Sequence, residues 1–450
     1  MTKKRQVAAA AVLVAIAATA VSVWALWPTP QPNVVVIIID TLRQDKLGAY
    51  GSEHETSPEI DRMANEGVRF DRAIAQSSWT RPSIGSMLTS QYPRTLGIYK
   101  EGGDILADDF ETIAEVLKGA GYTTLGATAN PNINSSFNFH QGFDHYSDSD
   151  VVFPWMDAEK GQESLAKAPL LSARQIFDSL LKEVKERKSP PYYLQANIME
   201  VHEWLDRRMD LRKYQREFLG ARDQRYLATI RLVSEEIERF VAELTALPEF
   251  KHTLFVFVSD HGEGLFDHEP VGNSSRHGLL LYESQVLVPL ILFATDGSLP
   301  RGKVVEAPVR LLDLVPTLLD YAGIEEPPGL AGKSLLASIE GSSAPDLPDH
   351  FIVETELRSA DAIAAYGPGW NYFEHRAPHP GTDPRELQEE AVDESGANTN
   401  ALDAHPEVGA ELQSALDAWE RAHPKVKATK RATPLPAIEE AQLRALGYID

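Results

Sequence analysis

The chain has 450 residues, with 43 Lys and Arg against 66 Asp and Glu, so its formal net charge is −23. This surplus of acids argues against a nucleic-acid partner, since phosphate backbones are held mainly by Lys and Arg. The apolar share of 43% is ordinary for a folded protein, and the lack of cysteine excludes disulfides and thiolate metal sites.

The N-terminus combines basic residues with an apolar run. Three basic residues at 3–5 precede an uncharged run from 7 to 27, and a membrane-spanning helix needs about 20 apolar residues. This order predicts a cytoplasmic N-terminus and an exported body. A signal peptide cleaved after Ala20 is the alternative; we favour an uncleaved anchor because the run is longer than the usual apolar region of a signal peptide. Residues 1–32 are therefore expected to form an anchor or signal peptide that ends in a Pro-rich linker.

Strand and helix patterns alternate beyond this segment. The continuous β-branched run at 33–39 predicts a central parallel strand that is buried on both faces. A helix is expected after Ser57, because Pro58 suits the first helical position and Gly67 ends the pattern. The further expected elements are a helix over 109–121, strands at 122–129 and 192–198, a helix over about 222–246, a strand that begins at 252, and a strand at 286–294.

This alternation predicts an α/β fold with a mostly parallel central sheet between helices. In such sheets, ligands bind at the carboxyl ends of the strands. Asp40 follows the 33–39 strand directly, and Asp260 follows the strand that ends at Ser259. We therefore expect both carboxylates at the same edge of the sheet.

The pattern weakens after about residue 345. A strand at 350–356, a polar loop at 386–400 and an amphipathic helix at 406–423 are expected there. The domain prediction is a catalytic domain over 33–345 and a small α+β subdomain over 346–450.

Adjacent Asp260 and His261 at a strand end are natural ligands for a divalent cation. Asp40 can complete the set from the neighbouring strand, since ionised carboxylates near a core need a partner. A carboxylate–imidazole set suits Zn or Mn, and an oxygen-rich one suits Ca or Mg, so the sequence leaves open which ion binds and whether one or two bind.

Several blocks together resemble the sulfatase family of the alkaline phosphatase superfamily. The segment "DTLRQDKLGAYG" (40–51) is similar to the family's first metal-binding block. "PSIGSMLTSQYPRTLG" (82–97) resembles the tail of its Cys-x-Pro-Ser-Arg active-site block, and "SDHGE" (259–263) resembles its second metal block. The similarity covers most of 33–450 in the family's order, and it implies an alkaline phosphatase/sulfatase-like fold and a bound divalent metal ion.

Carried over residue by residue, the resemblance places Asp40, Asp260 and His261 at the family's metal ligands. Thr80 stands at the position of the nucleophile, two residues before Pro82. In sulfatases that nucleophile is a formylglycine made from Cys or Ser, whereas the same oxidation of a threonine would give a ketone.

Two further positions depart from the family's pattern. Ile84 stands where the family has an arginine, and Thr41 stands where it has a second Asp. Threonine is, however, the nucleophile in the superfamily's phosphoethanolamine and phosphoglycerol transferases and in its phosphopentomutases. A metal ion beside Thr80 would lower the pKa of its hydroxyl and so prepare it as nucleophile and as an added metal ligand.

We therefore expect a metal-dependent hydrolase or transferase that acts on phosphoesters of envelope lipids or glycans. One alternative is a sulfuric ester hydrolase that uses threonine without formylglycine. Another is a catalytically silent scaffold that binds envelope polymers. The expected partners are a small anionic ester or a lipid or glycan headgroup, and the membrane through the N-terminal helix. The expected location is the cell envelope, with the catalytic domain anchored outside the cytoplasm, or a secreted or periplasmic form.

Additional side chains are candidates for the same site. Arg81, next to the nucleophile, could hold an ester oxygen in a bidentate way. His202 in "MEVHEW" is a candidate catalytic residue, and His277 in "RHG" is a candidate metal ligand; hydrogen bonding within a loop is the alternative for both. Other residues considered for the site are Glu200, His268 and Asn130.

Overall fold

The computed structural model describes residues 31–100, 103–148, 173–205, 209–268, 275–342, 347–390, 400–436, 439–440 and 443–444. The predicted anchor or signal peptide lies almost wholly outside these residues and stays a prediction. Among the helices of the described ranges, none combines the length and the apolar character needed to cross a bilayer.

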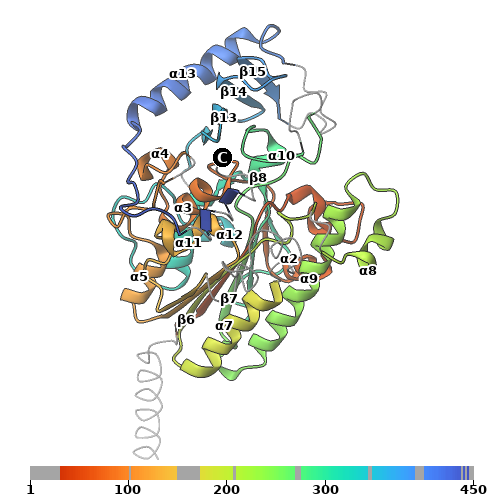
Figure 1. Ribbon diagram of the computed structural model, residues 1–450, viewed down its shortest axis with the longest axis vertical. Helices are drawn as coiled ribbons and strands as arrows, with labels where there is room; N and C mark the ends of the chain where they lie inside the picture. The colour runs from red at the N-terminus through yellow and green to blue at the C-terminus, as the bar shows by residue number, and fades with distance from the viewer. Residues whose placement is uncertain are drawn as a thin grey trace, which may run out of the picture.

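An eight-stranded sheet runs through the centre of the larger part of the molecule (Figure 1). Its strand order is β10–β2–β9–β7–β1–β6–β4–β5, and only β9 runs antiparallel to its neighbours. The expected mostly parallel sheet is confirmed. The strands are β1 Asn33–Ile39, β2 Val68–Phe70, β4 Thr123–Thr128, β5 His145–Ser147, β6 Tyr192–Ile198, β7 Thr253–Val258, β9 Leu290–Ala294 and β10 Lys303–Val305.

Helices cover both faces of this sheet (Figure 1). The helices of this part of the molecule are α2 Pro58–Glu66, α3 Thr80–Thr89, α4 Pro93–Leu96, α5 Ile113–Gly119, α7 Ala173–Arg187, α8 Arg212–Gln215, α9 Gln224–Thr245, α10 Glu283–Val286, α11 Leu314–Tyr321 and α12 Leu336–Glu340.

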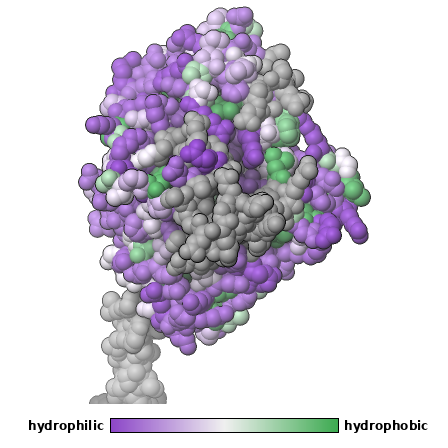
Figure 2. All heavy atoms as spheres, viewed as in Figure 1, coloured by the Kyte–Doolittle hydropathy of each residue, from purple (hydrophilic) through white to green (hydrophobic). Residues whose placement is uncertain are grey.

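Burial of β1 explains why residues 34–39 of this strand are all apolar. Its even-numbered residues from 34 to 38 pack with α3, α5 and α11, whereas its odd-numbered residues from 35 to 39 pack with α2, α7 and α9. A strand buried on both faces has no side that can be polar. The surface in Figure 2 is, in contrast, largely hydrophilic, with hydrophobic residues scattered over it.

The predicted strand at 286–294 is wrong as a single element. Pro289 divides it into β8 (Leu287–Val288) and β9, because proline has no N–H to donate to a strand ladder. β8 belongs to a separate three-stranded sheet with β3 (Ala73–Ile74) and β11 (Val309–Arg310).

The expected small C-terminal α+β part is present as an antiparallel sheet covered by α13, Pro406–Ala422 (Figure 1). Its strands are β12 Phe351–Thr355, β13 Asp361–Tyr366, β14 Trp370–Ala377 and β15 Arg385–Glu389. The predicted polar loop from 386 is therefore wrong at its start. Polar residues hide this strand in the sequence, because it pairs with only one neighbour and buries Leu387. Residues 391–399 of that loop lie outside the described ranges.

The chain beyond α13 returns to the larger part. The backbone N–H of Val426 donates to the carbonyl of Arg94 (2.8 Å), and the N–H of Ile105 donates to the carbonyl of Thr429 (3.0 Å). The domain division at 345/346 stays a prediction.

We predict that Phe177→Ala lowers the free energy of unfolding by about 3–5 kcal/mol. Phe177 of α7 and Phe240 of α9 stack with ring centroids 4.3 Å apart, and both are fully buried, so the substitution leaves a cavity between the two helices. Urea denaturation measures the change. Leu219→Ala, at a side chain that is 76% exposed, is the control and should stay within about 0.5 kcal/mol. A loss below about 1 kcal/mol for Phe177→Ala would contradict this packing.

Candidate active site

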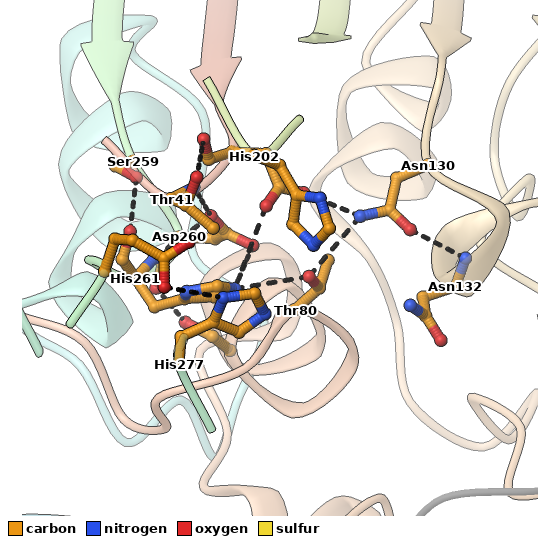
Figure 3. A network of polar contacts seen from close by, with 12 residues as sticks. Thr41, Thr80, Asn130, Asn132, His202, Ser259, Asp260, His261 and His277 are labelled. Atoms are coloured by element: carbon orange, nitrogen blue, oxygen red, sulfur yellow. Dashed lines mark hydrogen bonds and ion pairs between the residues drawn. The ribbon is translucent and has the colours of Figure 1, made fainter. Parts of the chain in front are cut away.

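Four neighbouring parallel strands end at one edge of the central sheet, and each is followed by a polar side chain of the candidate site. Asp40 follows β1, Asp260 lies two residues after β7, Asn130 lies two residues after β4, and His202 follows β6. Figure 3 shows the side chains of Asp260, Asn130 and His202 gathered around a common space. The expectation that Asp40 and Asp260 meet at one edge is confirmed.

Asp40, Asp260 and His261 form a fully buried group whose potential ligand atoms all lie within 4.8 Å of one another. Nε2 of His261 is 3.4 Å from Oδ2 of Asp260 and 3.9 Å from Oδ1 of Asp40. Neither of these two carboxylate oxygens has a hydrogen-bond partner among the described residues. Buried acceptors without donors, beside an imidazole nitrogen, fit a divalent cation.

Ionising both buried carboxylates is energetically unfavourable unless a positive charge lies beside them. Burial, and then the neighbouring charge of Asp260, raise the pKa of Asp40 well above its usual value. A cation between the two carboxylates would reverse both effects, because it stabilises their ionised forms.

The backbone orients His261 toward this group. Its Nδ1 lies 2.9 Å from the carbonyl oxygen of Gly262, which can only accept, so Nδ1 carries the proton and donates. Burial lowers the pKa of His261, which favours the neutral ring. The lone pair of a neutral imidazole is then on Nε2, on the side of the two carboxylates.

Thr41 forms the turn that follows Asp40 and is fixed there by hydrogen bonds of its backbone. Its φ of 60° lies in the left-handed region, which costs a β-branched residue about 1–3 kcal/mol. The Tyr226 hydroxyl donates to the Thr41 carbonyl (2.6 Å), and the Thr41 N–H donates to Oδ1 of Asp260 (3.3 Å). The position where the family has a second Asp thus contributes a backbone N–H to the buried acids.

Thr80 is the first residue of α3 and is fully buried. Its Oγ1 lies 3.3 Å from Nε2 of His261 and 3.4 Å from Nδ2 of Asn130. The positive end of the α3 dipole meets the same point, which favours negative charge there. The residue at the nucleophile position therefore directly adjoins the acidic group (Figure 3).

Arg81 and Ile84 lie farther along α3. Ile84 is fully buried in the hydrophobic core, so its position holds no polar group. Nε and Nη2 of Arg81 donate to the backbone oxygen (3.2 Å) and Oδ1 (2.9 Å) of Asn132, and its Cζ lies 3.7 Å from the ring centroid of Phe137. The hold of Arg81 on an ester oxygen stays a prediction.

Three histidines border the site in different charge states. The rings of His202 and His277 are 5.0 Å apart, and those of His261 and His277 are 4.4 Å apart. Burial opposes a charge on His202, but its 2.7 Å contact with Glu203 and nearby carboxylates outweigh burial and raise its pKa to about 9. Burial, and then the neighbouring histidines, lower the pKa of His277 well below its usual value. His277, 3.3 Å from Glu263, lies beside the three-residue acidic group, and its role as a metal ligand stays a prediction.

Two further residues that the sequence suggested for the site, Glu200 and His268, make contacts with other parts of the chain. Glu200 accepts a hydrogen bond from the Ala173 N–H at the start of α7. His268 lies 3.0 Å from the Ser284 hydroxyl, with its ring 4.5 Å from that of Tyr282.

Three residues of the site were not among those predicted from the sequence: Glu203, Glu263 and Asn132. Each lies within two residues of a predicted candidate, in the segments "VHEW", "SDHGE" and "TANPN". Adjacency in these loops was the available signal, but it did not show which carboxylate or amide turns inward.

Comparison with known proteins confirms the expected family and fold. A family model described as Sulfatase matches residues 32–324. The chain is 25% identical to an arylsulfatase from Clostridium perfringens, over 69% of this chain and 79% of the relative. It is 26% identical to an ulvan-active sulfatase from Formosa agariphila, over 68% and 64%. Its fold is similar to that of the phosphonate monoester hydrolase SpPMH from Silicibacter pomeroyi, with a TM-score of 0.68, 20% identity, and coverage of 90% of this chain and 100% of the other.

We predict that Asp260→Asn weakens the binding of a divalent ion by more than about 100-fold. Residues that only support metal ligands typically cost about 10–100-fold in affinity when they are replaced. The amide keeps an oxygen that can accept from the N–H groups of Thr41 and His261, so the change mainly removes the negative charge. Metal titration with Mn, Zn, Ca and Mg, checked by elemental analysis, measures it. Asp320→Asn, at a carboxylate in an exposed contact with Ser334, is the matched control. Equal affinities in both variants would exclude this group as a metal site.

We predict that His268 makes the fold less stable as the pH falls from about 6.5 to about 4. Burial lowers the pKa of His268 to about 4, whereas an unfolded histidine titrates near 6.5. The unfolded chain therefore binds more protons in this window, and stability is lost as the pH falls. Relative to His268→Gln, the wild-type free energy of unfolding should drop by about 2 kcal/mol between pH 7 and pH 5. A constant difference in urea denaturation across that range would refute the buried neutral state.

Proposed function

Because this chain belongs to the sulfatase family of hydrolases, we propose that Thr80 is the nucleophile of a metal-dependent hydrolase or transferase that acts on phosphoesters. The observation that carries the proposal is the position of the Thr80 hydroxyl. Oγ1 lies at the start of α3, 3.3 Å from His261 Nε2 and beside two carboxylate oxygens without donors. Among the described residues, Thr80 carries the one hydroxyl in hydrogen-bonding contact with this imidazole nitrogen.

Asp40, Asp260, His261 and Thr80 are the residues that would hold the cation. A divalent ion there supplies positive charge that lowers the pKa of the threonine hydroxyl and screens the charge of an incoming anionic ester. Thr80 loses its proton to water, and its oxygen forms a bond to phosphorus while the bond from phosphorus to the leaving oxygen breaks. The product of this half-reaction is a phosphothreonine and an alcohol.

His202 is suited to the leaving group. With its pKa raised to about 9, its ring carries a proton at neutral pH and can donate it to the departing oxygen. Figure 3 shows its ring and the Thr80 side chain facing the same space. In the second half-reaction, neutral His202 takes a proton from water or an acceptor alcohol as that oxygen attacks phosphorus and Thr80 departs.

The threonine at position 80 favours a phosphoester over a sulfate ester as the substrate. A sulfatase releases sulfate by elimination from a hydrated aldehyde, a route that needs a second hydroxyl on the nucleophile's carbon. Threonine has a methyl group there and lacks this route. A phosphothreonine can instead be attacked at phosphorus, with no second hydroxyl required.

Sulfate ester hydrolysis is the second candidate, and the sequence relatives favour it. Those named above are an arylsulfatase and an ulvan-active sulfatase. The structural neighbour named as a phosphonate monoester hydrolase supports a phosphorus ester on the same fold. Under either candidate, the predicted N-terminal anchor would hold the site outside the cytoplasm, near lipid headgroups or envelope glycans.

We predict that Thr80→Ala loses at least about 10³-fold in kcat/KM toward an aryl phosphate diester, since removal of a nucleophile leaves only binding and charge stabilisation. Thr80→Ser keeps the hydroxyl and should retain most of the activity. Intact-mass analysis of the metal-loaded enzyme should detect a phosphoryl adduct that maps to Thr80 and is absent in Thr80→Ala.

The matched control is Thr89→Ala, at the other end of α3, where the hydroxyl only donates to the Gly85 carbonyl. Unchanged turnover in Thr80→Ala would refute the nucleophile. Faster cleavage of an aryl sulfate than of aryl phosphates, without an adduct, would establish the second candidate. If the metal-loaded wild type turned over neither ester, the remaining alternative would be a catalytically silent scaffold.

A further inference from the structure

We infer that the side-chain amides of Asn130 and Asn132 form the subsite for the oxyanion of the ester, and that Arg81 acts by positioning Asn132. The inference deepens the proposed function, on which it rests for the identity of Thr80 as nucleophile. The ligand chemistry is a tetrahedral phosphoryl or sulfuryl oxyanion, whose non-bridging oxygen would accept from the amides.

The two asparagines come from one buried turn. After β4, the chain forms a short 3₁₀ helix at Pro131–Ile133, and both asparagines are at most 1% exposed. The N–H of Asn130 donates to Oγ1 of Thr128 (3.0 Å), and the N–H of Asn132 donates to Oδ1 of Asn130 (2.8 Å). Internal hydrogen bonds therefore fix the turn before any ligand binds.

The same contacts decide which way the Asn130 amide faces. Its Oδ1 accepts from a backbone N–H, so Nδ2 lies on the opposite side of the amide group. There Nδ2 donates to Oδ2 of Asp40 (2.6 Å) and lies 3.4 Å from Oγ1 of Thr80. Asn130 thus already contacts the proposed nucleophile and one of the buried acids.

Arg81 decides the orientation of Asn132 in a similar way. A guanidinium only donates, so the amide atom that faces Nη2 of Arg81 at 2.9 Å must be Oδ1. Nδ2 of Asn132 therefore points away from Arg81, and Figure 3 shows this nitrogen on the side of Thr80. Arg81 itself is held by the Asn132 backbone oxygen and by the Phe137 ring.

The donor on Asn132 is buried and has no hydrogen-bond partner among the described residues. A buried polar group without a partner destabilises the fold, so an unsatisfied donor at this place points to a ligand that completes it. An ester oxygen next to Thr80 would be such a ligand. At the position of the family's arginine, the buried Ile84 offers no donor, so the two amides would take over that contact with the oxyanion.

Asn132→Asp tests the subsite. One carboxylate oxygen can still accept from Arg81, while the other places a negative acceptor where the donor was. Metal content should stay at the wild-type level, whereas kcat/KM and the affinity for orthovanadate should both fall about 10²–10³-fold, as when one oxyanion donor is removed. Calorimetric titration of the metal-loaded enzyme with orthovanadate, phosphate and sulfate measures the binding.

Asn134→Asp is the matched control. It makes the same charge change two residues farther along, and its side-chain oxygen can still accept from the Ser136 N–H. Asn132→Ala, which removes the donor without adding charge, is the second variant in case the aspartate does not fold. Wild-type affinity for orthovanadate in both Asn132 variants would overturn the subsite, as would a metal-loaded wild type that binds none of the three anions.

Arg81→Lys tests the positioning role. Lysine keeps the charge but cannot hold the two oxygens of Asn132 in a bidentate way. Alone, it should lower kcat/KM and orthovanadate affinity by at least about 10-fold; in the Asn132→Ala background it should change neither. Independent, multiplying effects would show that Arg81 does not act through Asn132.

The experiments distinguish failure of the asparagine subsite from failure of Thr80 as the nucleophile. Weakened orthovanadate binding in Asn132→Asp, together with no loss of turnover in Thr80→Ala, would retain the subsite and reject the nucleophile. Loss of turnover in Thr80→Ala with unchanged anion binding in the Asn132 variants would retain the nucleophile and reject the subsite. Preference for phosphate or for sulfate in the wild type, lost in Asn132→Asp, would identify which oxyanion the subsite takes.

Discussion

Two carboxylates, Asp40 and Asp260, are buried side by side at the ends of adjacent parallel strands, and the rest of the site is organised around their charge. The sheet brings them together because β1 and β7 are neighbours that run in the same direction. Burying two acids that each have one oxygen without a donor is unfavourable unless a positive charge joins them. The neutral imidazole of His261 and the Thr80 hydroxyl complete a set of atoms that suits a cation.

The surrounding charges follow from the contacts of each side chain. Glu203 keeps a proton on His202, whereas burial keeps His261 and His277 neutral. Two histidines with opposite pKa shifts thus occupy one buried space: His202, which can donate a proton, and His261, which offers a neutral nitrogen to a cation. This local arrangement would allow a strongly acidic chain to accept the proposed anionic ester, because the net charge of the whole chain does not describe the charge within the site.

The altered positions of the family's pattern form a consistent group. Ile84 packs into the core, so the arginine's place is apolar, while the adjacent Arg81 turns toward the loop after β4. That loop presents two asparagine amides to the side of Thr80. In the proposed subsite, hydrogen-bond donors without charge take the place of a cationic side chain, and positive charge beside Thr80 would come from a bound cation and from His202.

The sequence by itself determined the α/β class, the bounds of β1 at 33–39, the start of α2 at Pro58 and the meeting of Asp40 with Asp260, because burial on both faces, helix capping and strand direction leave local patterns. It did not determine the edge strand β15 or the orientation of Asn132. Both depend on partners far away in the chain: β15 needs the backbone of β14, and the Asn132 amide needs a guanidinium 51 positions earlier. Only the tertiary structure decided them, because a side chain's direction is set by the donor or acceptor that packing places beside it.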